Sequence, residues 1–112
     1  MAEFLYLYRG GARGATPEES EQIMQKWMSW FQELTAGGNL KEGGQPLEAE
    51  GKVVGKGRAV TDGPYAEAKD LVGGYTLVSA ETLAHAAELA KGCPILDRGG
   101  EVEVRPIMQM DM

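Results

Sequence analysis

The residues with the clearest chemical potential lie in one run, residues 61–69, which reads TDGPYAEAK. This run joins a carboxylate, a glycine, a proline, an aromatic ring and a Glu/Lys pair. One interpretation is structural: Asp62 accepts hydrogen bonds from nearby backbone N–H groups, and the proline sets the direction of the chain after the turn. The other interpretation is a binding site, and the sequence leaves both open. The candidate ligand-binding residues of this run are Asp62, Gly63, Pro64 and Tyr65.

Two arginines form a second candidate group. Arg9 follows the first apolar run and Arg105 ends the last one. A guanidinium presents a planar fork that binds a carboxylate or phenolate. The chain has 11 basic and 17 acidic side chains, so two arginines near one opening would be informative. The alternative is that both are solvated or paired with Glu101, Glu103 or Asp97.

The remaining reactive residues predict no metal and no organic cofactor. His85 is the only histidine and Cys93 the only cysteine, so a zinc cluster lacks ligands and an internal disulfide is impossible. Cys93 stands before a proline and is expected to be a small structural residue. Trp27 and Trp30 fit a helix core, and we expect one of them to reach the edge of a cavity, because two tryptophans three residues apart cannot both point straight inward.

Length and composition limit the classes of protein to which the chain can belong. At 112 residues and 12.1 kDa, the chain fits a single domain, residues 1–112. A net charge of -6 provides no basic footprint for nucleic acid and disfavours an anionic membrane surface. The start of the chain lacks the pattern of a signal peptide, and no apolar stretch is long enough to span a bilayer. The expected location is the cytoplasm.

Local signals predict two helices. Thr16 can cap the first, with a proline at the first helical position and Glu19 closing a capping box. Glycines at 37 and 38 should end it. Ser79 can cap the second, which should stop at the Gly-Cys-Pro sequence of residues 92–94.

Five strands are predicted, at residues 4–8, 47–50, 52–60, 75–78 and 101–105. The second and third of these strands should form a hairpin, and residues 61–65 should form a turn.

The resulting order is β-α-β-β-β-α-β, which favours an α+β fold of the ferredoxin-like kind. Both helices should cover one face of the sheet, and the first and last strands should be central. Phe4, Tyr6 and Tyr8 are expected on the uncovered face, where a second copy of the chain is the simplest cover. The sequence therefore predicts a homodimer.

The runs VTDGPYAEAK (60–69), GGY (73–75), CP (93–94) and EVEVRP (101–106) resemble the DGPF branch of the YCII-related family, with Tyr65 in place of its phenylalanine. The resemblance extends over nearly the whole chain. It implies a ferredoxin-like fold that dimerises through its sheets, the dimeric α+β barrel, in a bacterial cytoplasmic protein. Relatives are often associated with extracytoplasmic-function sigma factors, and a few members of the wider family are enzymes acting on chlorinated hydroxyaromatics.

One departure from that family limits what the resemblance implies. The wider family's proposed catalytic pair is a histidine at the end of the first strand and an aspartate before the proline that follows the second helix. Tyr8 or Arg9 and Cys93 stand at those places here. The pair is absent, so the corresponding activity is not carried over.

We therefore expect a homodimeric protein that binds a small molecule. One alternative is a lyase or hydrolase acting on a small substrate such as a hydroxyaromatic, with Asp62 or Glu67 as base. A further alternative is an interaction accessory in sigma-factor signalling. Because helices should fill one face of the sheet, any cavity is expected between the two sheets of a dimer. There Arg9, Arg105 and the 62–65 turn of either copy would line a shared opening, with Tyr65 as an aromatic wall.

Overall fold

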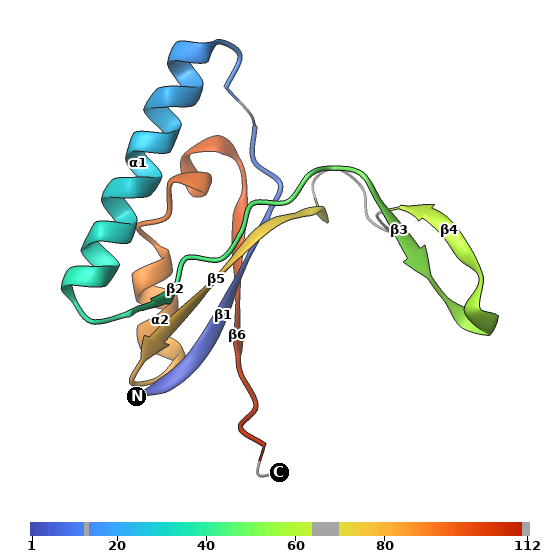
Figure 1. Cartoon of the computed structure of the whole chain (residues 1–112). Helices are drawn as coiled ribbons and strands as arrows, with labels where there is room; N and C mark the ends of the chain where they lie inside the picture. The colour runs from blue at the N-terminus through green and yellow to red at the C-terminus, as the bar shows by residue number, and fades with distance from the viewer. Residues whose placement is uncertain (13, 64–69, 111–112) are drawn as a thin grey trace.

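The structure is a computed structural model that describes residues 1–12, 14–63 and 70–110 (Figure 1). Pro64 and Tyr65, two of the predicted binding residues, lie outside the described residues. The helices are α1 (Pro17–Ala36) and α2 (Leu83–Ala90). The strands are β1 (Ala2–Arg9), β2 (Leu40–Glu42), β3 (Gly51–Val54), β4 (Val60–Gly63), β5 (Val72–Ala80) and β6 (Glu101–Pro106).

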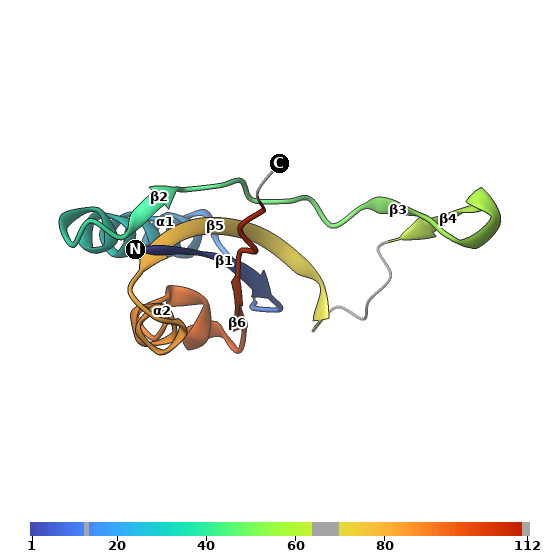
Figure 2. The ribbon, with the colours of Figure 1, turned by 90° about the horizontal axis from the view of Figure 1, so that it is seen from below.

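Four of these strands form an antiparallel sheet in the order β2-β5-β1-β6. Both helices lie on the same side of this sheet (Figure 2). This arrangement confirms the mixed α+β, ferredoxin-like fold. The expectation that the last strand is central was wrong: β6 is an edge strand, and β5 lies beside β1 in the middle.

The first helix begins and ends at the residues that the sequence indicates. The Thr16 side chain accepts a hydrogen bond from the Glu19 backbone N–H at 3.1 Å, and Glu19 Oε2 accepts one from the Ala15 N–H at 2.7 Å. The helix ends at Ala36, with Gly37 as its C-cap. Two orphan N–H groups are thereby satisfied, as in a capping box.

Several predicted boundaries were wrong. Residues 52–60 are not one strand, because the turn of the β3–β4 hairpin lies within them, and residues 61–63 are part of β4 rather than a turn. Residues 47–50 form no strand. Ser79 lies inside β5, and Thr82 caps α2 by accepting from the His85 N–H at 3.0 Å. The three-residue β2 was missed, since so short a run carries no alternation pattern.

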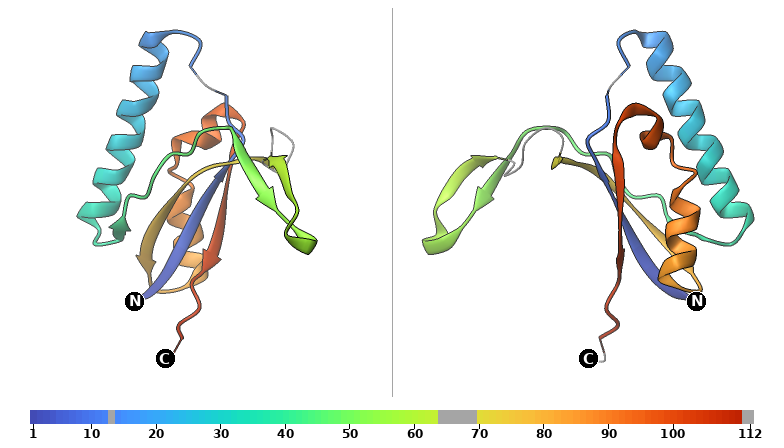
Figure 3. Two further views of the ribbon diagram at one scale, coloured as in Figure 1. Left: turned by 45° about the vertical axis from the view of Figure 1, so that its right-hand side comes forward. Right: turned by 180° about the vertical axis from the view of Figure 1, so that it is seen from behind.

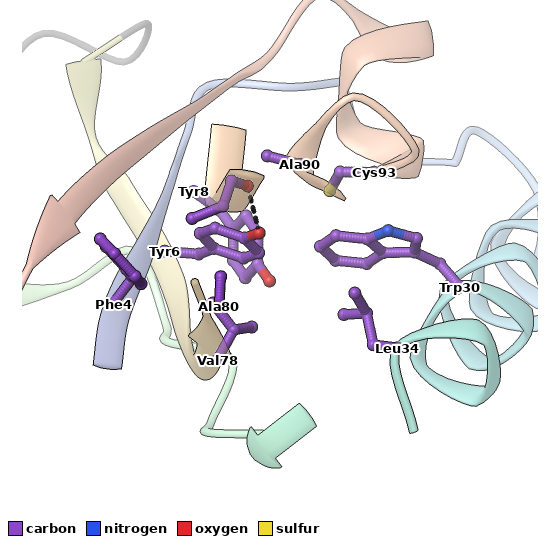
Figure 4. Close-up of a cluster of buried hydrophobic side chains, with 10 residues drawn as sticks. Phe4, Tyr6, Tyr8, Trp30, Leu34, Val78, Ala80, Ala90 and Cys93 are labelled. Atoms are coloured by element: carbon purple, nitrogen blue, oxygen red, sulfur yellow. Dashed lines mark hydrogen bonds between the residues drawn. The ribbon is translucent and has the colours of Figure 1, made fainter. Parts of the chain in front are cut away.

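The core lies between the sheet and the helices (Figure 4). Phe4, Tyr6 and Tyr8 point from β1 toward the helices and are buried there, so the prediction that these three await a partner was wrong. Because side chains alternate along a strand, Leu5 and Leu7 are the apolar residues of β1 on the uncovered face.

Hydrogen bonds join this core to both helices. The Tyr6 hydroxyl donates to the Ala86 carbonyl of α2 at 2.6 Å. The Trp30 indole of α1 donates to the Leu89 carbonyl at 3.2 Å, and its ring stacks on Tyr6 with centroids 5.9 Å apart. Such bonds let aromatic side chains be buried without an unpaired polar group.

The β3–β4 hairpin projects from the rest of the molecule on the side away from both helices (Figures 1 and 3). Its strands pair with each other in a separate two-stranded sheet. The radius of gyration is 15.5 Å, whereas a compact chain of this length has about 13 Å. The difference reflects a segment that is not packed into the body of its own chain.

We expect Tyr6→Phe to lower the free energy of unfolding by on the order of 1–2 kcal/mol, because the ring stays while the Ala86 carbonyl loses its donor in a buried place. Urea denaturation measures this loss. The control is Tyr75→Phe, since the Tyr75 hydroxyl makes no hydrogen bond to another described residue, and it should change stability little. Equal losses in the two variants would contradict the assignment.

Candidate functional site

A cavity of about 570 Å³ opens between the first half of α1 and the sheet. Its walls come from α1, from the end of β1, from the start of β5, from the segment 43–49 that follows β2 and from Ile95 in the turn after α2. β2 is only three residues long, so beyond Glu42 the described part of the chain places no further strand behind the N-terminal half of the helix. A 20-residue helix spans about 30 Å, which is much longer than this strand.

Aromatic rings line one side of this cavity. The Tyr8 and Trp27 rings meet edge to face with centroids 4.8 Å apart, and the Trp27 and Phe31 centroids are 5.9 Å apart. The expectation that one of the two tryptophans reaches a cavity edge is confirmed, since Trp27 lines the cavity while Trp30 is buried in the core. The aliphatic residues of the wall are Ile23, Met24, Pro46, Leu47, Ala49, Leu71 and Ile95.

A chain of hydrogen bonds crosses the floor of the cavity. The Tyr8 hydroxyl donates to Thr76 Oγ1 at 2.7 Å, and Thr76 Oγ1 donates to the Gly43 carbonyl at 3.0 Å. Burial raises the pKa of Tyr8 well above its usual range, although the bond to Thr76 opposes this. Tyr8 therefore keeps its proton at neutral pH and acts as a hydrogen-bond donor, not as a base.

Glycine pairs let the backbone segments of the wall approach one another. Gly44 has a φ of +74°, and a Cβ there would run into the Tyr75 carbonyl oxygen. A Cβ on Gly74 would lie 3.0 Å from the Gln45 carbonyl oxygen. The segment after β2 can therefore follow β5 closely only because these residues lack side chains.

The predicted arginines lie together, but not at this cavity. On the uncovered face of the sheet, Arg9 Nε is 2.8 Å from Glu103 Oε1, and Arg105 Nη1 is 3.2 Å from Glu103 Oε2. Arg9 Nη1 also donates to the Asp70 carbonyl at 2.6 Å. The bond from Arg9 and then that from Arg105 lower the pKa of Glu103. Pairing with Glu103 was the structural alternative for both arginines.

Asp62 and Gly63 lie apart from both the cavity and the two arginines. Asp62 is on the projecting hairpin, where its carboxylate is 95% exposed and 2.8 Å from Lys52 Nζ. Gly63 ends β4 on the same hairpin. Within one copy of the chain, the structure does not bring Asp62 together with Arg9 and Arg105, and none of them lines the cavity.

The cavity itself was missed, because the sequence reasoning assumed that the helices fill their face of the sheet. That assumption was wrong: the cavity lies on the helix-covered side. Three Gly-Gly pairs, at 10–11, 43–44 and 73–74, line it. They were a possible signal, but the pairs at 37–38 and 99–100 do not line it, so glycine pairs alone would not have located the site.

The described residues offer no metal centre and no membrane span. No group of three or more His, Cys, Asp or Glu side chains within them could hold a metal ion. Burial raises the pKa of the Cys93 thiol to about 12, which fits its expected structural role. Neither α1 nor α2 is long and apolar enough to cross a membrane.

Comparison with known proteins identifies the family. The YCII-related domain matches residues 4–111, and the chain therefore belongs to the YCII-related family. A similar solved structure is 5-chloro-2-hydroxyhydroquinone dehydrochlorinase (TftG) from Burkholderia phenoliruptrix AC1100, in complex with 2,5-dihydroxybenzoquinone. The two chains share 16% identity over 96% of this chain and 95% of the other, with a TM-score of 0.48. This likeness is too weak to say anything about activity. No curated protein matches the chain.

We expect Gly44→Ala to destabilise the protein by at least about 2 kcal/mol more than Gly38→Ala. Both glycines have a φ of +74°, so both variants carry the same backbone strain, but a Cβ on Gly38 meets nothing within 4 Å. Chemical denaturation of the two variants isolates the contact with the Tyr75 carbonyl. Equal destabilisation would contradict the close approach of the cavity wall to β5.

Proposed function

We propose that this protein is a homodimer that binds a small, uncharged aromatic molecule in the cavity between α1 and the sheet. The observation that carries this proposal is the chemistry of the wall. Twenty described residues line the cavity, and none of them is Asp, Glu, Lys, Arg or His.

We also propose that the chain belongs to the DGPF branch of its family. The sequence motifs at residues 61–63 and 73–75 support this assignment.

The wall favours a flat, apolar ligand with a few hydrogen-bonding groups. Tyr8, Trp27 and Phe31 supply ring faces and edges. The glycines expose backbone N–H and carbonyl groups, which orient a ligand without adding charge. A volume of about 570 Å³ falls within the range of small-molecule sites. A charged ligand would lose its hydration with no charged side chain among the described wall residues to replace it.

This wall supports binding rather than catalysis. Tyr8 stays protonated, and no described side chain of the cavity is a general base at neutral pH. Asp62, the base of the alternative lyase or hydrolase, is exposed on the hairpin beside Lys52. An accessory role in sigma-factor signalling requires no cavity, so the presence of one favours ligand binding.

The dimer is supported by the uncovered face of the sheet. Its centre is apolar, with Leu5 and Leu7 of β1 beside Tyr75 and Leu77 of β5. Around this centre lie opposite charges, as in the ion pair of Lys41 with Glu3 and in the Arg9–Glu103–Arg105 cluster. A second copy therefore meets both signs of charge there, although each chain carries a net charge of -6.

The exposed area also supports a second copy. The chain exposes 8113 Å², whereas a monomeric protein of 12.1 kDa exposes about 6,000 Å². The excess of about 2,000 Å² per chain is of the size that an obligate homodimer buries.

The ligand class can be tested with 2-naphthol and 2-naphthoate, which share a ring system but are neutral and anionic at pH 7. In ¹H–¹⁵N spectra we expect 2-naphthol to shift the Trp27 indole N–H more than that of Trp30, which donates to Leu89. Leu47→Lys should weaken 2-naphthol binding at least fivefold, because it places a charge in the wall.

The matched control for that variant is Leu96→Lys. Leu96 is 43% exposed, close to the 46% of Leu47, but it does not line the cavity, so its variant should bind 2-naphthol normally. Tighter binding of 2-naphthoate, lost in Arg9→Gln, would contradict the neutral cavity and favour the predicted arginine site.

The dimer can be tested by sedimentation. The wild-type protein should sediment at about twice 12.1 kDa at micromolar concentration. Leu5→Asp should give a folded monomer, because it places an unpaired charge at the centre of the interface, while Leu96→Asp should remain a dimer. A wild-type protein that stays monomeric at high concentration would rule the dimer out.

A further inference from the structure

The β3–β4 hairpin, residues 51–63, is here called the hairpin arm. It projects past the uncovered face of the sheet, away from the helices (Figures 2 and 3). Its tip is a turn in which the Gly55 N–H donates to the Ala59 carbonyl at 2.8 Å and the Arg58 N–H to the Gly55 carbonyl at 3.0 Å. The arm is thus a formed hairpin rather than an irregular loop.

One face of the arm is apolar and unpacked. Val54 and Val60 are directly paired across the two strands, and they are 68% and 59% exposed. The Lys52–Asp62 pair lies next along the same face, two residues away on each strand. An isolated two-stranded hairpin is only marginally stable in water, so this face is expected to pack against something.

The charge of the arm indicates which surface its apolar face packs against. The arm holds three basic residues and one acidic residue, a net charge of +2, so the rest of the chain carries -8. The two bases at its tip are Lys56 and Arg58. The arm is therefore attracted to the acidic body of another copy of this chain, whereas the two bodies as wholes repel each other.

The position of the arm also favours a second copy of the chain as its partner. The arm extends on the side of the sheet where the proposed second copy would lie (Figure 2).

We propose that the hairpin arm of each copy packs its Val54–Val60 face against the body of the other copy and so clasps the dimer. This inference rests on the proposed homodimer but adds a separate contact to it. Each arm would be ordered by its partner, and the two arms would be equivalent by the two-fold symmetry of a dimer.

The test uses the double variant Val54→Thr/Val60→Thr. Threonine keeps the shape and strand preference of valine but removes apolar surface, so the hairpin itself is retained. We expect the dimer dissociation constant, measured by sedimentation over a dilution series, to rise at least tenfold. Val53→Thr is the matched control on the opposite face of the same strand, and it should change the constant less than twofold.

Hydrogen exchange supplies a readout specific to the arm. The amides of β3 and β4 should exchange at least tenfold more slowly in the concentrated dimer than in dilute protein or in the Leu5→Asp monomer.

Three outcomes would contradict the clasp. If the protein is a monomer at every concentration, the proposed homodimer is wrong and the clasp is wrong with it. If a dimer forms but the double variant dissociates like wild type and arm exchange is unchanged, the clasp alone is wrong. Slow exchange of the arm in the monomer would place it against its own copy and would also overturn the clasp.

Discussion

The structure depends on the need to satisfy two buried hydroxyl groups on the central strand β1. Tyr6 reaches between the layers and donates to the Ala86 carbonyl, which positions α2 over the sheet. Tyr8 donates to Thr76, which in turn donates to the Gly43 carbonyl of the segment that leaves β2. Burial raises the pKa of both phenols, that of Tyr6 to about 12, so both remain donors at neutral pH. One strand therefore fixes both a helix and a cavity wall on the same face of the sheet.

The parts of the fold that were predictable carry their signals locally. The capping residue Thr16 and the glycines after Ala36 mark both ends of α1, and the alternation of β6 gives its inward face. The orientation of β1 was not predictable in this way, because residues 4–8 are apolar without a break and an unbroken run has no preferred face. Packing against Trp30, which lies far along the chain, decides that Tyr6 rather than Leu5 points to the helices.

The candidate site was harder to predict, for a physical reason. Charged and catalytic residue types attract attention in a sequence, and they led to Asp62, Arg9 and Arg105. The two arginines do lie together, joined by Glu103, because β1 and β6 are neighbours in the sheet. The cavity, however, is built from five separate segments, and its described lining consists of uncharged side chains and glycine backbone. Such a site exists only through tertiary contacts, and its sequence signals, the spacing of Trp27 and Trp30 and three of the Gly-Gly pairs, do not locate it.

The short strand β2 links the cavity to the hairpin arm. A strand that continued beyond Glu42 would have paired with the start of β5, where the structure has only a single bridge between Pro46 and Gly74. Because regular strand pairing ends there, the chain first closes the side of the cavity along residues 43–49 and then forms the arm before it rejoins the sheet at β5. The wall and the arm are consecutive parts of the segment between β2 and β5. The contact proposed for the arm on a second copy would therefore also restrain residues 43–49, the segment that closes the cavity.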